Sequence, residues 1–409
     1  MTARIEHVHA RRVWDSRGRP TVEVDIVATG GAHGRAIAPA GASTGAAEAV
    51  DLRDGGTAHG GLDVRRAVAA VNGEIAAALR GHDVGDQKGI DRRLIALDGT
   101  AAKSRLGGNA LIATSMAAAH AAAAAQGLPL WRYLAGGAAR ESLPLPEIQI
   151  LGGGAHAHRR VDIQDFMVVA IGADGFAQAL DWTAEIYRAA GRLLADAGRL
   201  AGVADEGGFW PVFDSNEDAL DLTMRAIERA GFRPGHDVAL SLDIAATQLR
   251  NGEDYVLARD GRRLHSGEFA ELQLGWLARY PIVAIEDPLA EDDINGFMTF
   301  TQAAGSRVAV VGDDLLCTDP ERIRAAAASH ACNTALIKPN QIGTLTETRA
   351  ALDAARAAGF GAIVSARSGE TEDATVVHLA VGWDVEMLKV GSFARSERMA
   401  KWNEGLRIA

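Results

Sequence analysis

The sequence predicts an α/β fold in which a (β/α) barrel follows a smaller N-terminal α+β domain. The main observation is a series of four short apolar segments, VALSLD, IVAIED, VAVVGD and ALIK, which suit strands buried on both faces. Each segment carries a charged residue at or next to its end: Asp243, Glu286, Asp313 and Lys338. By subtraction these residues lie 43, 27 and 25 positions apart, and the two shorter intervals suit one strand-plus-helix unit. Ala-rich amphipathic segments between them, such as 319–330 and 345–358, are predicted to be covering helices.

Residues 1–136 are predicted to form the small α+β domain, and residues 140–409 the barrel. Alternation of apolar and polar residues predicts three antiparallel strands and a turn at 16–20, the strands being 4–10, 21–28 and 34–39. Helical patterns follow at 63–80, 87–97 and 107–126. The segment GGAARESLPLPE at 136–147 mixes Gly and Pro with polar residues and is predicted to link the two domains.

Composition narrows the classes of function. Hydrophobic residues make up 48% of the chain, charged residues 23%, and the net charge is −11, which argues against a general nucleic-acid or anionic-membrane binder. Cys317 and Cys332 predict no disulfide framework, and the N-terminus lacks the apolar run of a secretory signal, so we expect a cytoplasmic protein. The Ala-rich stretch 111–125 is too short and weakly apolar to span a membrane. We therefore expect a small-molecule partner, and neither nucleic acid nor a membrane.

The strand-end residues predict a metal site with an adjacent base. The active site of a (β/α) barrel lies at the carboxyl ends of its strands, so we expect all four residues at one mouth. Asp243, Glu286 and Asp313 offer the oxygen ligands that Mg²⁺ prefers. A lysine beside such a cation is expected to have a lowered pKa, which makes Lys338 the candidate base. The alternative is that the carboxylates cap helices or pair with arginines.

The same segments, in order, resemble the motifs of the enolase family, the phosphopyruvate hydratases. The matching motifs are WDSRGRPTVEVD at 14–25, AGASTG at 40–45, and SLDIAAT, AIEDPL, VGDDL, IKPNQIGT, SARSGETED and LKVGSFARSER. The resemblance runs from about residue 4 to the end of the chain and implies an enolase-type (β/α) barrel with an N-terminal α+β capping domain. It also implies two Mg²⁺ per active site, which stabilise an enolate, a phosphorylated acid as substrate, and a homodimer or higher homo-oligomer.

The resemblance assigns further residues to the reaction. Asp165 and Glu206 match a pair of acids at the leaving group, and because two carboxyls held close cannot both ionise easily, one is expected to keep a proton. Glu206 is the expected proton donor. His156 matches the histidine of a mobile loop, and Ser43 matches a ligand of the second Mg²⁺ on another mobile loop, 40–49, which is followed by a helical pattern.

Three more residues match the groups that bind the anionic ends of the substrate. Arg367 and Ser368 match the phosphate clamp, in which a planar guanidinium takes two phosphate oxygens at once. Lys389, at the end of the last predicted barrel strand, matches the lysine that binds the substrate carboxylate.

Some residues depart from the family pattern on the phosphate and leaving-group side. Ala366 stands where enolases carry histidine, and Asp165 is one methylene shorter than their glutamate. Further departures are Ala40, Gly152, Ala155 and Trp210. The departures predict retained enolisation with altered chemistry at C3 or at phosphorus, and the chain is similar to the carboxyphosphonoenolpyruvate synthases of phosphinothricin-type phosphonate biosynthesis. An ordinary enolase and a non-catalytic scaffold remain the alternatives.

The loop GGGAHAHRR at 152–160 concentrates cationic residues in an acidic protein. Beside His156 it contains His158, Arg159 and Arg160. One hypothesis is that the two arginines bind a second anion, for instance a nucleotide-activated phosphonoformate, since Arg suits bidentate contacts with oxyanions. The alternative is that they face solvent or pair with acids such as Asp162.

Overall fold

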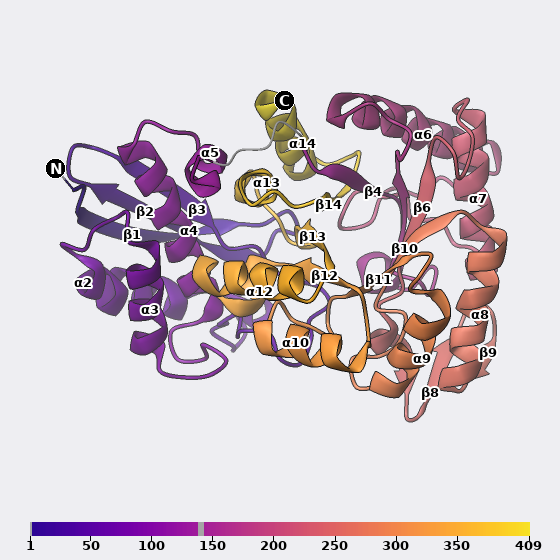
Figure 1. Cartoon of the computed structure of the whole chain (residues 1–409), viewed down its shortest axis with the longest axis horizontal. Helices are drawn as coiled ribbons and strands as arrows, with labels where there is room; N and C mark the ends of the chain where they lie inside the picture. The colour runs from indigo at the N-terminus through magenta and orange to yellow at the C-terminus, as the bar shows by residue number, and fades with distance from the viewer. Residues whose placement is uncertain (1, 138–142) are drawn as a thin grey trace.

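The computed structural model describes residues 2–137 and 143–409 (Figure 1). The N-terminal part contains an antiparallel sheet in the order β1-β2-β3: β1 (Ile5–Trp14), β2 (Pro20–Ala28) and β3 (His33–Ile37). The helix α4 (Gly108–Ala125) packs across β2 and β3. It is buried on nearly all sides, and its many alanines let it approach the sheet closely, so that a Cβ at Gly34 would lie 2.1 Å from the Ala117 carbonyl oxygen.

The predicted helices of this part are present. The pattern at 63–80 corresponds to α1 (Arg65–Ala70), a π-helical turn (Val71–Ile75) and α2 (Ala76–Leu79). α3 (Gln87–Asp98) begins where the Asp86 carboxylate accepts the Gly89 N–H and ends at Gly99, whose φ of +70° suits glycine. α5 (Leu130–Ala135) follows α4. The helical pattern predicted after the loop at 40–49 is wrong: residues 38–57 contain no helix.

The C-terminal part is a closed barrel, in which the described residues provide eight strands in the order β10-β11-β12-β13-β14-β4-β5-β6. The strands are β4 (Leu145–Gly152), β5 (Asp165–Val169), β6 (Ala239–Asp243), β10 (Ile282–Glu286), β11 (Ala309–Gly312), β12 (Thr334–Ile337), β13 (Gly361–Ser365) and β14 (Met387–Ser392). β5 runs antiparallel to both of its neighbours, whereas the other pairs are parallel. The first residue of β5 therefore lies at the edge where the other strands end.

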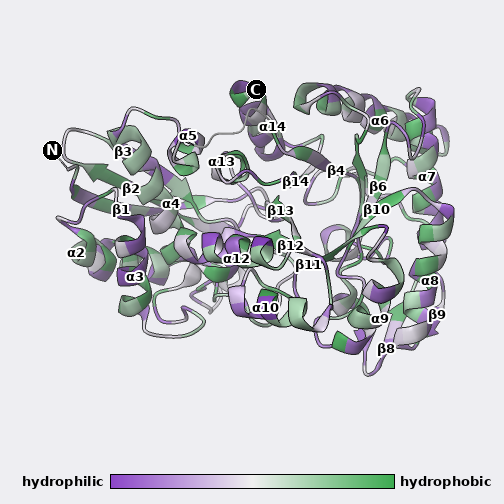
Figure 2. Ribbon diagram, viewed as in Figure 1, coloured by the Kyte–Doolittle hydropathy of each residue, from purple (hydrophilic) through white to green (hydrophobic). Residues whose placement is uncertain are grey.

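Helices cover the outside of the barrel (Figure 1). They are α6 (Phe176–Asp196), α7 (Asn216–Arg229), α8 (Ser266–Arg279), α9 (Ile294–Ala304), α10 (Pro320–Ser329), α12 (Leu345–Ala357), α13 (Thr375–Gly382) and α14 (Ser396–Ile408). Short elements complete this part: α11 (Pro339–Ile342) and a small sheet of β7 (Arg250–Asn251), β8 (Asp254–Leu257) and β9 (Arg262–Leu264). The barrel strands are mostly apolar while the helices show mixed faces (Figure 2), as expected for buried strands under amphipathic helices.

The predicted linker at 136–147 is too long at its C-terminal end, because β4 already begins at Leu145 and pairs with β14. Residues 138–142 of that segment lie outside the described residues. In the part of the chain that the structure describes, no helix has both the length and the apolar character needed to cross a bilayer.

Buried polar contacts attach the N-terminal part to the barrel. Asp91 of α3 accepts hydrogen bonds from the Ser115 hydroxyl on α4 and from the Thr346 hydroxyl on α12, at 2.7 and 2.6 Å. Lys103 forms an ion pair of 2.7 Å with Glu347. The segment after β3 is attached to the barrel separately, through the pairing of Ala40 with Gly369.

Candidate active site

The charged residues predicted at the strand ends lie at one edge of the barrel. Asp243 and Glu286 are the last residues of β6 and β10 and face each other in register. Asp313 follows β11 directly, and Lys338 follows β12. All four side chains are buried. Parallel strands end at the same edge, so apolar segments that each end in a charged residue bring those residues together.

Lys389 of β14 lies among the carboxylates of this edge. Its Nζ is 2.9 Å from Asp243 Oδ2, 2.6 Å from Glu286 Oε2 and 3.6 Å from Asp165 Oδ2. Burial lowers the pKa of Lys389, but Asp243 and Glu286 raise it further, so the net pKa lies well above its ordinary value. Lys389 therefore keeps a positive charge at the centre of the site.

Lys338 is paired with Asp313 rather than free. Its Nζ lies 2.5 Å from Asp313 Oδ2, while Gln341 Nε2 donates to Asp313 Oδ1 at 2.8 Å. Burial lowers the pKa of Lys338, but the Asp313 carboxylate raises it more, so the pKa is raised overall. The lowered pKa was expected for a lysine beside a bound cation, and it stays a prediction. A cation held by Asp313 would neutralise the carboxylate that causes the increase.

The two predicted acids lie on either side of a histidine. His156 Nδ1 is 3.4 Å from Asp165 Oδ1, and His156 Nε2 is 3.9 Å from Glu206 Oε1. Burial raises the pKa of Glu206, and the Asp165 charge raises it further. Burial also tends to raise the pKa of Asp165, but His156 and Lys389 lower it below its ordinary value. Of the two acids, Glu206 therefore keeps its proton to a higher pH than Asp165.

The histidine itself is held in its cationic form. Burial lowers the pKa of His156, but Glu206 and Asp165 raise it more, so the pKa is raised overall. His156 lies in a short 3₁₀ helix (Gly154–Ala157) of the loop between β4 and β5. It is only 5% exposed, so the loop carries its histidine into the site instead of into solvent.

Arg367, the predicted phosphate clamp, already binds a carboxylate of the protein. Glu48 accepts from both terminal nitrogens of its guanidinium, at 3.0 and 3.1 Å. The remaining N–H groups of those nitrogens are taken by Asn340 Oδ1 at 3.1 Å and by the Ser43 carbonyl oxygen at 2.8 Å. The outer edge of the guanidinium is thus occupied by groups of the protein itself, and its role as a phosphate clamp stays a prediction.

A small pocket connects these groups. It is lined by Ser43, His156, Gln164, Asp165, Glu206, Asp243, Lys338, Ser365, Ala366, Arg367, Ser368 and Lys389. Ser368 Oγ is buried and has no hydrogen-bond partner within residues 2–137 and 143–409. Most of the predicted site residues thus line one cavity, to whose wall Ala366 contributes only a methyl group. The predicted residues that are not part of this lining are Glu286, Asp313, Arg159 and Arg160.

Both parts of the chain match models of one family. Residues 5–134 match the model described as the enolase N-terminal domain, and residues 140–409 match the enolase C-terminal TIM barrel domain. The chain belongs to the enolase family. The barrel with its N-terminal β-rich domain agrees with the fold that this membership implies.

The mouth of this enolase-family barrel contains acidic groups that fit a divalent cation. Glu286 Oε1 is buried and has no hydrogen-bond partner among the described residues, so one carboxylate oxygen is free to act as a ligand. Asp243 and Asp313 add two further buried carboxylates, but Lys389 lies against Asp243 and Glu286, and Lys338 lies against Asp313. Two groups of the described residues have potential ligand atoms within 4.8 Å of one another, namely His156, Asp165 and Glu206, and Asp287, Asp313 and Asp314.

The arginines of the 152–160 loop do not pair with the predicted acid. The Asp162 carboxylate instead accepts the N–H groups of Ala258 and Arg259, at 3.1 and 3.0 Å. Arg159 donates to the Gln248 carbonyl oxygen at 3.3 Å, and the Arg160 guanidinium lies 4.9 Å from the centre of the Trp210 ring.

Several site residues escaped the sequence analysis. Gln164 donates to Asp243 Oδ2 at 2.9 Å, and Asp287 accepts the N–H groups of Asp313 and Asp314. Glu48 contacts Arg367, which lies 319 residues away in the sequence. Gln164 directly precedes the predicted acid Asp165, and Glu48 lies in the loop predicted at 40–49. Their place beside predicted site residues was the only signal that pointed to them.

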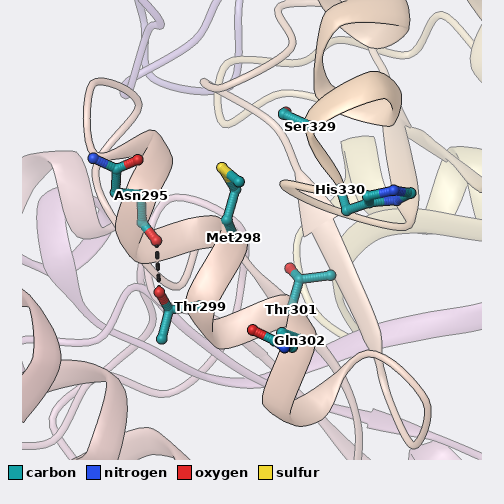
Figure 3. Close-up of a pocket in the computed structure, with 7 residues that line it drawn as sticks. All are labelled: Asn295, Met298, Thr299, Thr301, Gln302, Ser329 and His330. Atoms are coloured by element: carbon teal, nitrogen blue, oxygen red, sulfur yellow. Dashed lines mark hydrogen bonds between the residues drawn. The ribbon is translucent and has the colours of Figure 1, made fainter.

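A larger hollow lies on the outside of the barrel, away from this site. Figure 3 shows its lining by one face of α9 and by Ser329 and His330 at the end of α10. The α9 residues are Asn295, Met298, Thr299, Thr301 and Gln302. His330 is the only titratable residue of this described lining, so the hollow offers no second group with which it could form an acid–base pair or a metal site.

Proposed function

We propose that this enolase-family protein is a Mg²⁺-dependent enzyme that removes the α-proton of a phosphorylated acid of the 2-phosphoglycerate or phosphoenolpyruvate type. The observation that carries the proposal is the placement of two buried lysines against three strand-end carboxylates at one barrel edge. Lys338 is the base, and Lys389 binds the substrate carboxylate. Asp243, Glu286 and Asp313, with Ser43 from the loop after β3, hold up to two Mg²⁺ ions. When bound, these ions supply the positive charge that an α-proton next to a carboxylate needs before it can leave.

The leaving-group side carries its own acid. Glu206, whose pKa is raised by burial and by Asp165, donates a proton to the departing group. The positive charge of His156 compensates the negative charge of Asp165 beside it. Arg367 and Ser368 bind the phosphorus-containing end. Because Ala366 supplies no hydrogen-bonding group there, we infer that dehydration of 2-phosphoglycerate is slow.

The finer proposal is that the enzyme acts in phosphonate biosynthesis, as carboxyphosphonoenolpyruvate synthases do. The proposal is supported by Arg159 and Arg160, two arginines of the loop that also carries His156. Among the described residues no carboxylate lies within 4.0 Å of the Arg159 or Arg160 guanidinium, although the protein carries a net charge of −11. Two arginines without acidic partners suit a second anion, such as the donor end of a nucleotide-activated phosphonoformate.

The decisive assay uses the purified protein with Mg²⁺ and 2-phosphoglycerate, followed at the absorbance of the enol product. We expect little product from this substrate alone, and a new phosphorus resonance when a nucleotide-activated phosphonoformate is added. Turnover of 2-phosphoglycerate at the rate of a glycolytic enzyme would instead establish an ordinary enolase. Absence of both product formation and exchange of the α-proton with solvent would favour a non-catalytic scaffold.

A further inference from the structure

Gln149 of β4 connects the two elements that carry the acid pair. Its side chain is completely buried. Its Nε2 donates to Asp165 Oδ1 at the start of β5, and its Oε1 accepts the Gly208 N–H at 2.8 Å, two residues after Glu206. Both ends of one amide are therefore used, one on each acid-bearing segment.

The contact with the Glu206 loop is close enough to depend on glycine. A Cβ built on Gly208 would lie 2.4 Å from Gln149 Oε1, a distance at which one of the two groups would have to shift. The loop is further fixed to β4 by backbone hydrogen bonds of Phe209, from its N–H to the Ile150 oxygen at 3.0 Å and from Gly152 to its oxygen at 2.9 Å. Gln149 adds the side-chain link that ends at the carboxylate of the neighbouring strand.

For Asp165 this link is the main hydrogen bond. Within residues 2–137 and 143–409, Gln149 is the only residue that donates a hydrogen bond to the Asp165 carboxylate. His156 and Lys389 lie farther away, at 3.4 and 3.6 Å. The position of the Asp165 carboxylate relative to His156 thus depends on the reach of the Gln149 side chain.

The two side chains also complement each other in length. Asp165 is one methylene shorter than the glutamate that the family resemblance implies at this position. Gln149 is long enough to place its Nε2 on this retracted carboxylate while its Oε1 still accepts the Gly208 N–H. An asparagine at 149 would fall one methylene short of the aspartate, whereas a glutamate at 165 would collide with the glutamine.

We propose that Gln149 is a positioning residue that sets the Asp165 carboxylate and the Glu206 loop at the separation needed for proton transfer to the leaving group. This separation is set by the match in length between the glutamine at 149 and the aspartate at 165. The inference rests on the proposed function, because the proposed reaction is what the activity test measures. The match in length between the two side chains can also be tested without that reaction.

The test is a cycle of four proteins: the native chain, Gln149→Asn, Asp165→Glu, and the double variant. Each single change should lower kcat for product formation by about tenfold or more, because a misplacement of about 1 Å can cost that much. The double variant restores the combined length and should recover to within about threefold of the native rate. Exchange of the α-proton, which uses Lys338, should change much less than product formation in the single variants.

Gln273→Asn provides the matched control. Gln273 is also completely buried, and its Nε2 donates to the Pro288 oxygen at 2.8 Å, outside the candidate site. This variant should lose thermal stability without a selective loss of product formation. Losses that simply add in the double variant, or equal losses of exchange and product formation in the single variants, would overturn the proposal.

Two measurements need no substrate. Hydrogen exchange of the Gly208 amide should accelerate in Gln149→Asn and in the double variant, because both carry the shorter side chain at 149, but not in Asp165→Glu. The melting temperature of the double variant should lie above the value expected from adding the losses of the two single variants. Native protein that shows neither α-proton exchange nor product would defeat the proposed function. In that case the melting temperatures still decide whether the two side chains are matched in length, and losses that simply add in the double variant would overturn the inference by themselves.

Discussion

Glu48 and Arg367 form a buried two-pronged ion pair that fastens the loop after β3 over the mouth of the barrel. Because Asn340 and the Ser43 carbonyl take the other terminal N–H groups, the guanidinium keeps only its Nε–H for another acceptor. The loop can approach this closely because residue 41 is glycine, where a Cβ would lie 1.9 Å from Arg367 Nη2. A phosphate that takes two oxygens to the outer edge of Arg367 must therefore displace Glu48.

Glu48→Gln should make Arg367 more receptive to anions and the protein less stable. Removing one partner of a buried ion pair leaves the other charge without compensation, which costs about 3 to 5 kcal/mol. Inorganic phosphate can replace the lost charge, so it should raise the melting temperature of the variant more than that of the native protein. The measurement is thermal unfolding with and without phosphate.

Glu347→Gln is the control, since Glu347 forms the other ion pair between the N-terminal part and the barrel, with Lys103 at 2.7 Å. It should lower the melting temperature without increasing the response to phosphate. The same response to phosphate in both variants would show that Glu48 does not occupy an anion site.

Asp313→Asn should weaken Mg²⁺ binding by about tenfold or more, a loss of about 1.4 kcal/mol or more. Asp313 is buried, and its two oxygens face Lys338 and Gln341. The substitution removes one negative charge from the cation site while it keeps the shape of the side chain. Calorimetric titration measures the affinity, with Asp353→Asn on the exposed face of α12 as the control. An unchanged affinity in Asp313→Asn would remove this residue from the metal site.

Lys338→Met should abolish exchange of the α-proton of 2-phosphoglycerate with deuterium from the solvent. Lys338 is the base of the proposed reaction, and the other lysine of the described pocket lining, Lys389, contacts both Asp243 and Glu286 and is assigned to the substrate carboxylate. Proton NMR in deuterated buffer follows the loss of the α-proton signal. Lys103→Met, which removes a buried lysine outside the site, should still exchange. Exchange at the native rate in Lys338→Met would mean that another group is the base.

The sequence predicts the parts of this site that depend on local pattern. Apolar segments that end in a charged residue indicate strand ends directly. The prediction of strand ends is therefore correct for Asp243, Glu286, Asp313 and Lys338. The antiparallel direction of β5 was not predicted, because strand direction depends on pairing with β4 and β6 and leaves no mark on the apolar residues 166–169.

Contacts between distant segments escaped prediction for the same reason. The Glu48 contact with Arg367 joins two loops that meet only when the N-terminal part seats on the barrel. The raised pKa of Lys338 likewise follows from the direct contact with Asp313, which sequence spacing places nearby but does not orient. The fold could largely be predicted from the sequence, whereas the pairing of side chains within the site could not.

Replacing Arg159 and Arg160 by alanine together should weaken a nucleotide-linked phosphonoformate by about tenfold or more and leave phosphoenolpyruvate binding nearly unchanged. Each charge-assisted hydrogen bond to an anion contributes about 1.5 to 3 kcal/mol. Neither guanidinium has a carboxylate partner among the described residues, so the change breaks no internal ion pair. The matched control removes two exposed arginines of the outer helices, Arg192→Ala on α6 with Arg225→Ala on α7. Equal losses for both ligands, or none, would show that the loop binds no second anion.

Two histidines meet where the N-terminal part packs on the barrel. The rings of His120 on α4 and His378 on α13 lie edge to face, with centroids 6.1 Å apart. His120 Nε2 is 2.9 Å from the Thr375 hydroxyl, and His378 Nε2 is 3.3 Å from Glu404 Oε1. Burial and the neighbouring His120 together lower the pKa of His378 to about 4, although Glu404 opposes the shift. Both rings are thus held neutral by the packing of the two parts.

The protein should therefore lose stability as the pH falls from about 6.5 to 4, and His378 should account for much of the loss. Above about pH 6.5 the His378 ring is neutral in the folded and the unfolded protein, so it adds no pH dependence to the stability. Below about pH 6.5 the unfolded chain binds a proton on this ring, whereas the folded protein does so only near pH 4. The difference amounts to about 2 kcal/mol at pH 5. His378→Gln should flatten the fall in melting temperature between pH 7 and 5, while His236→Gln, at an exposed position, should not. An equally steep fall in His378→Gln would assign the acid sensitivity to other groups.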